Sequence, residues 1–135
     1  MTYPISAIEG IAPAMRAKLK AVGIRTTDKL LERAKSVTDR QRLAEATEID
    51  TKSLLSIANL ADRMRIKGVG EDYARLLQTA GVDTVRELRY RNPANLAKKM
   101  AQANAERKLV RVLPSEPMIK RWIEHARELP LIIKY

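Results

Sequence analysis

The sequence predicts an all-α protein made of two tandem copies of one helical unit, packed into a single compact bundle. The 135-residue composition is the first reason, because good helix formers such as Ala, Leu, Lys, Arg and Glu are frequent while Phe is absent and strand signals are sparse. An internal repeat is the second reason. The third is that apolar residues at the end of each copy recur at the spacing of one helix face.

Two offsets define the repeat. In the first part of each copy, matching residues are 58 positions apart, as in Gly10 and Gly68. In the last part, matching residues are 65 positions apart, as in Leu54 and Ile119. The second copy therefore contains about seven additional residues in its middle. We therefore expect two units, which cover residues 1–65 and 66–135.

Each copy is expected to begin with a helix that lies between two glycines. In the first copy this helix follows Gly10 and ends at Gly23, and in the second it follows Gly70 and ends at Gly81. A glycine at the end of a helix can take the positive φ that closes it. Pro13 fits the first turn of its helix, where a missing N–H costs little.

Polar residues suited to capping mark the start of the three helices that follow in each copy. The expected caps are Thr26 or Thr27, Ser36 or Thr38, and Asp50 in the first copy, and Thr84, Asn92 and Ser115 in the second. We expect the last helix of each copy to be the longest. The segment 106–113 could be helical or extended, and the apolar tail 129–135 is expected to pack back on the bundle.

The charge balance points to a polyanionic partner. There are 26 Lys and Arg against 16 Asp and Glu, which leaves +10, so nucleic acid is the first candidate. The alternative is that the basic residues only solvate helix faces. They cluster at Arg16, Lys18, Lys20 and Arg25, at Arg86, Arg89 and Arg91, at Lys98 and Lys99, and at Arg107, Lys108 and Arg111. Tyr90 is expected to be a half-buried ring rather than a platform for a base.

The two-glycine turns suggest how such a partner is held. A glycine before a helix lets a phosphate approach the unpaired N–H groups and positive dipole end of that helix. This contact does not read bases, so it fits binding without sequence preference. The candidate nucleic-acid-binding residues are Gly10, Ile11, Lys67, Gly68, Val69, Gly70, Arg75, Arg86, Arg89, Arg91, Lys98 and Lys99.

Other residues in these turns favour a purely structural role. Ala12 and Pro13 replace the second glycine and one amide donor in the first copy. In the second copy Glu71 and Asp72 follow the turn directly, and carboxylates there satisfy the helix end that a phosphate would use. A protein-interaction or scaffold module is therefore the main alternative. An accessory subunit that meets nucleic acid only inside a larger complex is a third.

The residues of the second turn resemble a known motif. Residues 66–70, with Leu77, Gly81, Val82 and Thr84, are similar to the helix-hairpin-helix of DNA-binding repair and replication proteins. In that superfamily the hairpin lies against the minor groove and its amides hold phosphates. The resemblance implies DNA more than RNA as the ligand.

A closer resemblance covers nearly all of the second copy, and more weakly the first. It rests on the order of 68–70, 81–85, 91–96, 109–111, 113–115 and 122–130. This order resembles the helix-hairpin-helix-related bacterial family catalogued as domain of unknown function 4332. The resemblance implies an all-helical, SAM-like fold and no activity.

Catalytic and cofactor sites are not expected. His125, near Glu124 and Glu128, is the only histidine, and there is no Cys to complete a metal site or form a disulfide. Trp122 beside it is expected in the core. No apolar run approaches the roughly 20 residues of a membrane span, and the N-terminus lacks a secretory signal pattern. We therefore expect a soluble, cytoplasmic protein that is not an enzyme and binds no cofactor.

Overall fold

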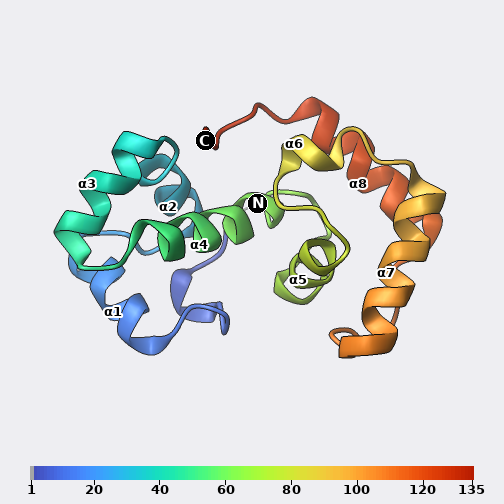
Figure 1. Ribbon diagram of the computed structural model, residues 1–135, viewed down its shortest axis with the longest axis horizontal. Helices are drawn as coiled ribbons and strands as arrows, with labels where there is room; N and C mark the ends of the chain where they lie inside the picture. The colour runs from blue at the N-terminus through green and yellow to red at the C-terminus, as the bar shows by residue number, and fades with distance from the viewer. Residues whose placement is uncertain (1) are drawn as a thin grey trace. The chain divides into compact units, whose positions relative to one another are not determined.

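The computed structural model describes residues 2–135, and within that range it contains helices and no strand (Figure 1). The prediction of an all-α protein is confirmed. The elements are η1 Ile5–Ala7, α1 Pro13–Ala21, α2 Thr27–Arg33, α3 Val37–Thr47, α4 Thr51–Arg63, α5 Glu71–Thr79, α6 Val85–Leu88, α7 Pro93–Arg107 and α8 Glu116–Glu128.

The chain forms two compact units. The first unit comprises residues 2–62 and 132–135, and therefore η1 and α1 to α4 up to residue 62. The second unit comprises residues 63–131, with α5 to α8. The sequence places the change of unit after residue 65 and assigns the last four residues to the second copy, whereas in the structure those four residues belong to the first unit.

The expected helix caps are present. The side chains of Thr26, Ser36, Asn92 and Ser115 each accept a hydrogen bond from the backbone N–H three residues later. The Asp50 carboxylate accepts from Ser53 N at 2.9 Å in the same way. Thr84 is the exception: it stands at the N-cap of α6, but its hydroxyl donates to the Glu87 carboxylate and accepts no backbone N–H.

Helix ends also follow the sequence, with one correction. Gly23 and Gly81 have φ of 85° and 96°, the conformation expected of glycines that close α1 and α5. The expectation that α8 is longer than α7 is wrong, because α7 has 15 residues and α8 has 13. The sequence of α7 is rich in alanine and other residues of high helix propensity, so the helix continues to Arg107. It ends at Lys108, which has φ 51°.

The segment after α7 is neither helix nor strand. The Asn104 side chain holds it, because its Oδ1 accepts from Val110 N at 3.0 Å and its Nδ2 donates to Val110 O at 3.1 Å. Tyr73 on α5 adds a hydrogen bond from its hydroxyl to Val112 O at 3.0 Å. This irregular segment therefore lies against the second unit with specific polar contacts.

The core of each unit is aliphatic. Leu19, Ile24, Leu30 and Leu54 have no exposed surface in the first unit. In the second unit α7 packs on α8 and α5, and the buried side chains include Leu77, Leu96, Ile119 and Trp122. Trp122 is 3% exposed, which confirms its expected place in the core. Its ring lies 5.3 Å from that of Tyr73 in a tilted arrangement.

The C-terminal tail packs back, as expected, but its last four residues join the first unit rather than the copy to which the sequence assigns them. Ile133 is 4% exposed, and Lys134 N donates to Lys35 O at 2.7 Å. Arg40, itself 4% exposed, donates to Lys134 O at 2.7 Å and to Ala34 O at 2.9 Å. Burial lowers the pKa of Arg40, and these two carbonyls compensate part of the cost of placing a charge there.

Candidate nucleic-acid interface

The second glycine turn joins α4 to α5 in the way the sequence suggests. Gly68 has φ 89°, which is unfavourable for any residue with a Cβ. Val69 is completely buried, and its N–H donates to Ile66 O at 3.0 Å. Gly70 is the N-cap of α5 and no side chain caps the helix there. The turn thus combines a buried apolar residue with two exposed or half-exposed glycines.

Only part of the main chain in this turn is available to a ligand. Lys67 N donates to His125 Nδ1 at 3.1 Å, and the amide of Val69 is already used within the turn. Within residues 2–135 the amides of Gly68 and Gly70 have no hydrogen-bond partner. A phosphate at this turn would therefore be held by those two amides and by the first turn of α5.

The carboxylates that follow the turn disfavour the binding of an anion at the start of α5. Glu71 Oε2 accepts from Arg75 NH2 at 2.8 Å, one helical turn away, so these two charges largely offset each other. Arg75 is thereby held by its own helix rather than directed to a ligand. Asp72 is exposed in the same first turn. The net effect of α5 on an approaching phosphate is weak.

A hollow of about 500 Å³ lies beside the turn and has mixed charge. Its walls carry Lys67 and Arg121 but also Glu124 and Glu128, with His125 between them. Gly68 forms part of the rim, where a Cβ would lie 3.4 Å from Trp122 Nε1. Because the cations and carboxylates balance, the hollow itself has no clear preference for an anion.

The first glycine turn offers fewer donors. Ile11 is fully buried, and its amide donates to Ile8 O at 3.3 Å. Gly10 is exposed. Ala12 is the N-cap of α1 without a side-chain cap, and Pro13 at the first helical position has no N–H to give. Of the two turns, the second has the more complete set of main-chain donors.

Two of the predicted arginines hold helix ends together. Arg89 donates from Nε to Ala126 O at 2.8 Å and also to Leu129 O, at the C-terminal end of α8. Arg91 donates to Ala80 O at 3.3 Å, at the C-cap of α5. A guanidinium is favourable at these sites because it satisfies carbonyls and the negative dipole end. Packing within the second unit accounts for both residues.

The same use of arginine recurs elsewhere in the chain. Arg63 is 2% exposed and donates to Ala74 O at 2.7 Å and Asp83 O at 2.8 Å. Other arginines that donate to main-chain carbonyls are Arg16, Arg33, Arg40, Arg65 and Arg127. A substantial part of the basic excess therefore satisfies the backbone, and the count of charges overstates what is available to a partner.

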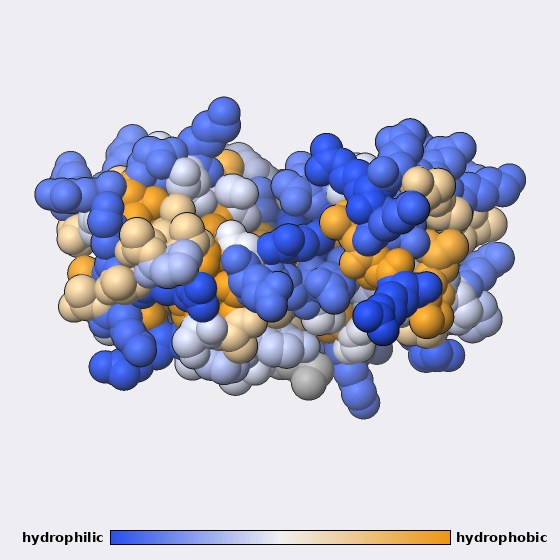
Figure 2. Space-filling view, turned by 90° about the horizontal axis from the view of Figure 1, so that it is seen from below, coloured by the Kyte–Doolittle hydropathy of each residue, from blue (hydrophilic) through white to orange (hydrophobic). Residues whose placement is uncertain are grey.

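The remaining predicted cations are exposed in the second unit. The side chains of Arg86, Lys98 and Lys99 have no hydrogen bond or ion pair within residues 2–135. Residues 63–131 contain 15 Lys and Arg against 8 Asp and Glu, a net charge of +7 out of +10 for the chain. On the face seen in Figure 2, hydrophilic side chains cover much of this unit, with apolar ones exposed among them.

One stretch of the second unit is nearly free of carboxylates. From residue 88 to residue 115 the only acidic residue is Glu106. We call its exposed cations the basic segment: Lys98, Lys99, Arg107, Lys108 and Arg111. The sequence shows the last three as a cluster, but they are missing from the predicted site. The long gap between carboxylates would have pointed to them.

Tyr90 corrects a further expectation. Its side chain is 83% exposed rather than half-buried. Arg89 and Arg91, on either side, donate to main-chain carbonyls of the second unit, whereas the ring between them stays at the surface. An exposed aromatic ring is a platform on which an unpaired base can stack.

Neither a metal cluster nor a membrane helix is found among residues 2–135. In that range no group of three or more His, Asp or Glu side chains could hold a metal ion. None of the helices described there is both long and apolar enough to span a bilayer.

The comparisons with known proteins identify a family. A family model described as domain of unknown function (DUF4332) matches residues 9–129. The chain belongs to the DUF4332 family. The match covers both units, and the resemblance seen in the order of the sequence motifs is confirmed. No curated protein and no solved structure matches this DUF4332 chain.

Proposed function

We propose that this protein is a non-catalytic helical module that binds nucleic acid weakly and without sequence preference. In this proposal each unit is a helix-hairpin-helix-like element, and DNA is the preferred ligand. The observation that carries it is the basic segment, five exposed cations in a stretch with a single carboxylate. Such a stretch attracts phosphates without reading bases.

The second glycine turn would add main-chain contacts. The amides of Gly68 and Gly70 have no hydrogen-bond partner within residues 2–135, and Lys67 between the helices is exposed. These donors are short of a complete phosphate site because Lys67 N is held by His125. Affinity should therefore come mainly from Lys and Arg side chains, and it should be strongly dependent on salt.

A titration of labelled duplex and single-stranded DNA at several salt concentrations tests the proposal. We expect binding at low salt, with a log–log slope of about −0.9 for each phosphate neutralised. The double variant Lys98→Gln, Lys99→Gln should weaken binding equally for different sequences and reduce the slope by about 1 for each lost contact. Fluorescence anisotropy measures both quantities.

The matched control is Lys35→Gln, Lys52→Gln. It removes the same charge from exposed lysines of the first unit. An equal loss of affinity in both variants would show that net charge alone drives binding. The assignment of the interface to the basic segment would then be wrong. No binding at low salt would reject the nucleic-acid proposal altogether.

A protein-interaction module is the second candidate. The observation that favours it is the exposed apolar surface of the irregular segment after α7, where Val112 is 72% and Leu113 is 43% exposed. Glu71 and Asp72 at the start of α5 also disfavour a phosphate there. If DNA binding is absent, substitution of Val112 and Leu113 by Ser should abolish association with a protein partner instead.

A further inference from the structure

A hollow in the first unit is lined by cations and by no carboxylate. Its volume is about 650 Å³, within the range of sites that hold small molecules. Arg16, Lys20 and Arg25 supply three positive charges, and Ser6, Pro13 and Ile24 are among the other lining residues. None of these residues belongs to the basic segment or to the second glycine turn.

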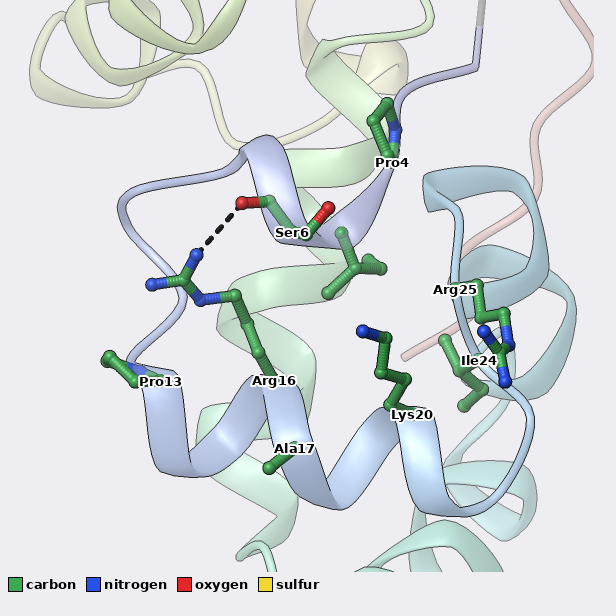
Figure 3. Close-up of a pocket in the computed structure, with 9 residues that line it drawn as sticks. Pro4, Ser6, Pro13, Arg16, Ala17, Lys20, Ile24 and Arg25 are labelled. Carbon is green, nitrogen blue, oxygen red and sulfur yellow. Dashed lines mark hydrogen bonds between the residues drawn. The ribbon is translucent and has the colours of Figure 1, made fainter.

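The three cations line the same hollow, two from α1 and one from the turn that follows it. Arg16 and Lys20 are one turn apart on α1, so their side chains leave the same side of the helix. Figure 3 shows both rising from α1 toward η1, while Arg25 lies beside Ile24 in the turn that follows α1. Lys20 and Arg25 make no side-chain hydrogen bond within residues 2–135.

Arg16 is held in place and yet incompletely satisfied. Its NH1 donates to Ser6 O at 2.9 Å, which fixes the guanidinium against η1. Its Nε is buried and has no hydrogen-bond partner within the described residues. A buried N–H without a partner is costly and rare, and because this atom is closed to solvent, a ligand in the hollow reaches it only if the Arg16 side chain moves.

The start of α1 adds to the positive character of the hollow. Pro13, the first residue of this nine-residue helix, lines it, and the first turn contains no acidic residue. By contrast, the first turn of α5 contains both Glu71 and Asp72. The positive dipole end of α1 is therefore not offset by carboxylates of its own helix.

We propose that this hollow binds a phosphate monoester. Three cations, one of them a fixed guanidinium, match a dianion that accepts several hydrogen bonds better than a single carboxylate. The exposed apolar lining residues Pro4, Pro13 and Ala17 leave room for the organic part of the molecule. This site goes beyond the proposed nucleic-acid interface, because all its residues lie in the first unit.

Nuclear magnetic resonance titration of the full chain with adenosine 5′-monophosphate tests the site. We expect saturable shifts of backbone amides within residues 4–25, the same shifts with pyrophosphate, and none with adenosine. The absence of saturable shifts with both phosphate compounds would overturn the proposal. So would equal shifts with adenosine, because the phosphate would then contribute nothing.

Variants locate the binding. Lys20→Gln, Arg25→Gln removes two cations whose side chains make no hydrogen bond within residues 2–135, so the fold should persist, and it should weaken binding about tenfold or more. Lys18→Gln is the control, since Lys18 is exposed on the same helix but does not line the hollow. Equal weakening by this control would refute the site.

A final arm separates a free ester from the phosphates of a DNA backbone. Duplex DNA should not shift the amides of residues 4–25 in the way that the monophosphate does. If DNA alone produces those shifts and the monophosphate does not, the hollow binds backbone phosphate and the proposal of a small ligand is wrong. The salt titration of the Lys98, Lys99 variant remains a separate test of the interface.

Discussion

At the scale of single residues, the two glycines of the second turn have different roles. Gly68 has φ 89° and lies against the Trp122 indole, whereas Gly70 has φ −86° and open space where a Cβ would be. The sequence presents them as one motif. Backbone conformation separates a glycine that the turn requires from one that it does not.

Replacement of each glycine by alanine tests this difference. Gly68→Ala should destabilise the protein by about 1–2 kcal/mol, because a left-handed conformation is unfavourable with a Cβ. Gly70→Ala, the control, should cost only about 0.5 kcal/mol, because alanine is a poorer N-cap than glycine but the φ of −86° suits it. Urea denaturation measures both, and equal effects would contradict the assignment.

Arginine is the residue type whose role the sequence least reveals. Arg63, Arg89 and Arg91 all donate to main-chain carbonyls at or near helix ends. Arg86, in the same stretch, is exposed and makes no such bond. Composition counts the four alike, but only the packing of carbonyls around each guanidinium decides whether it is available to a ligand.

At the scale of elements, helix starts follow local chemistry. A side-chain oxygen that accepts an N–H three residues later acts within one turn, so sequence alone identifies it. Asp50 is the cap of α4, with Ser53 N at 2.9 Å and Ser53 Oγ at 2.7 Å. These hydrogen bonds from Ser53 lower the pKa of Asp50.

Asp50→Ala should therefore destabilise the first unit at neutral pH. A lowered pKa in the folded state means that the ionised cap stabilises the protein above about pH 4, the pKa of an unfolded Asp, and that this contribution disappears as the pH falls through the folded value. Denaturant unfolding at a series of pH values from 7 downward should show that the difference in free energy of unfolding between wild type and variant becomes smaller. Asp50→Asn, which caps without titrating, is the control and should keep its stability in acid. A difference in free energy of unfolding that does not change with pH would refute the role of the carboxylate.

At the scale of the whole molecule, charge is unevenly shared between the units. The second unit carries +7, and the first carries +3 from 11 Lys and Arg against 8 Asp and Glu. Yet the first unit contains the hollow whose only charged lining residues are cations, while the hollow in the second is lined by charges of both signs. Net charge and local charge thus point to different surfaces, and the two experiments proposed above address them separately.

The C-terminal tail completes the first unit across a long sequence separation. Ile133 is 4% exposed, and Lys134 and Arg40 bond across 94 positions. Ile133→Ala should destabilise the first unit by about 2 kcal/mol through lost burial. The control Leu131→Ala, at a side chain 42% exposed, should cost less than about 0.5 kcal/mol. Hydrogen exchange of first-unit amides distinguishes them, and similar protection in both variants would contradict the packing.

The sequence by itself determined the helical class, the helix caps at Asp50 and Ser115, and the helix-closing glycines Gly23 and Gly81, and it narrowed two other caps to Thr26 or Thr27 and Ser36 or Thr38. These features depend on contacts within a few residues, which local residue types are enough to specify. Only the tertiary structure decided that Arg89 and Arg91 serve carbonyls, that Tyr90 is exposed, and that the tail joins the first unit. Those outcomes depend on groups brought together from distant parts of the chain, and a side chain's partners exist only once the helices have packed.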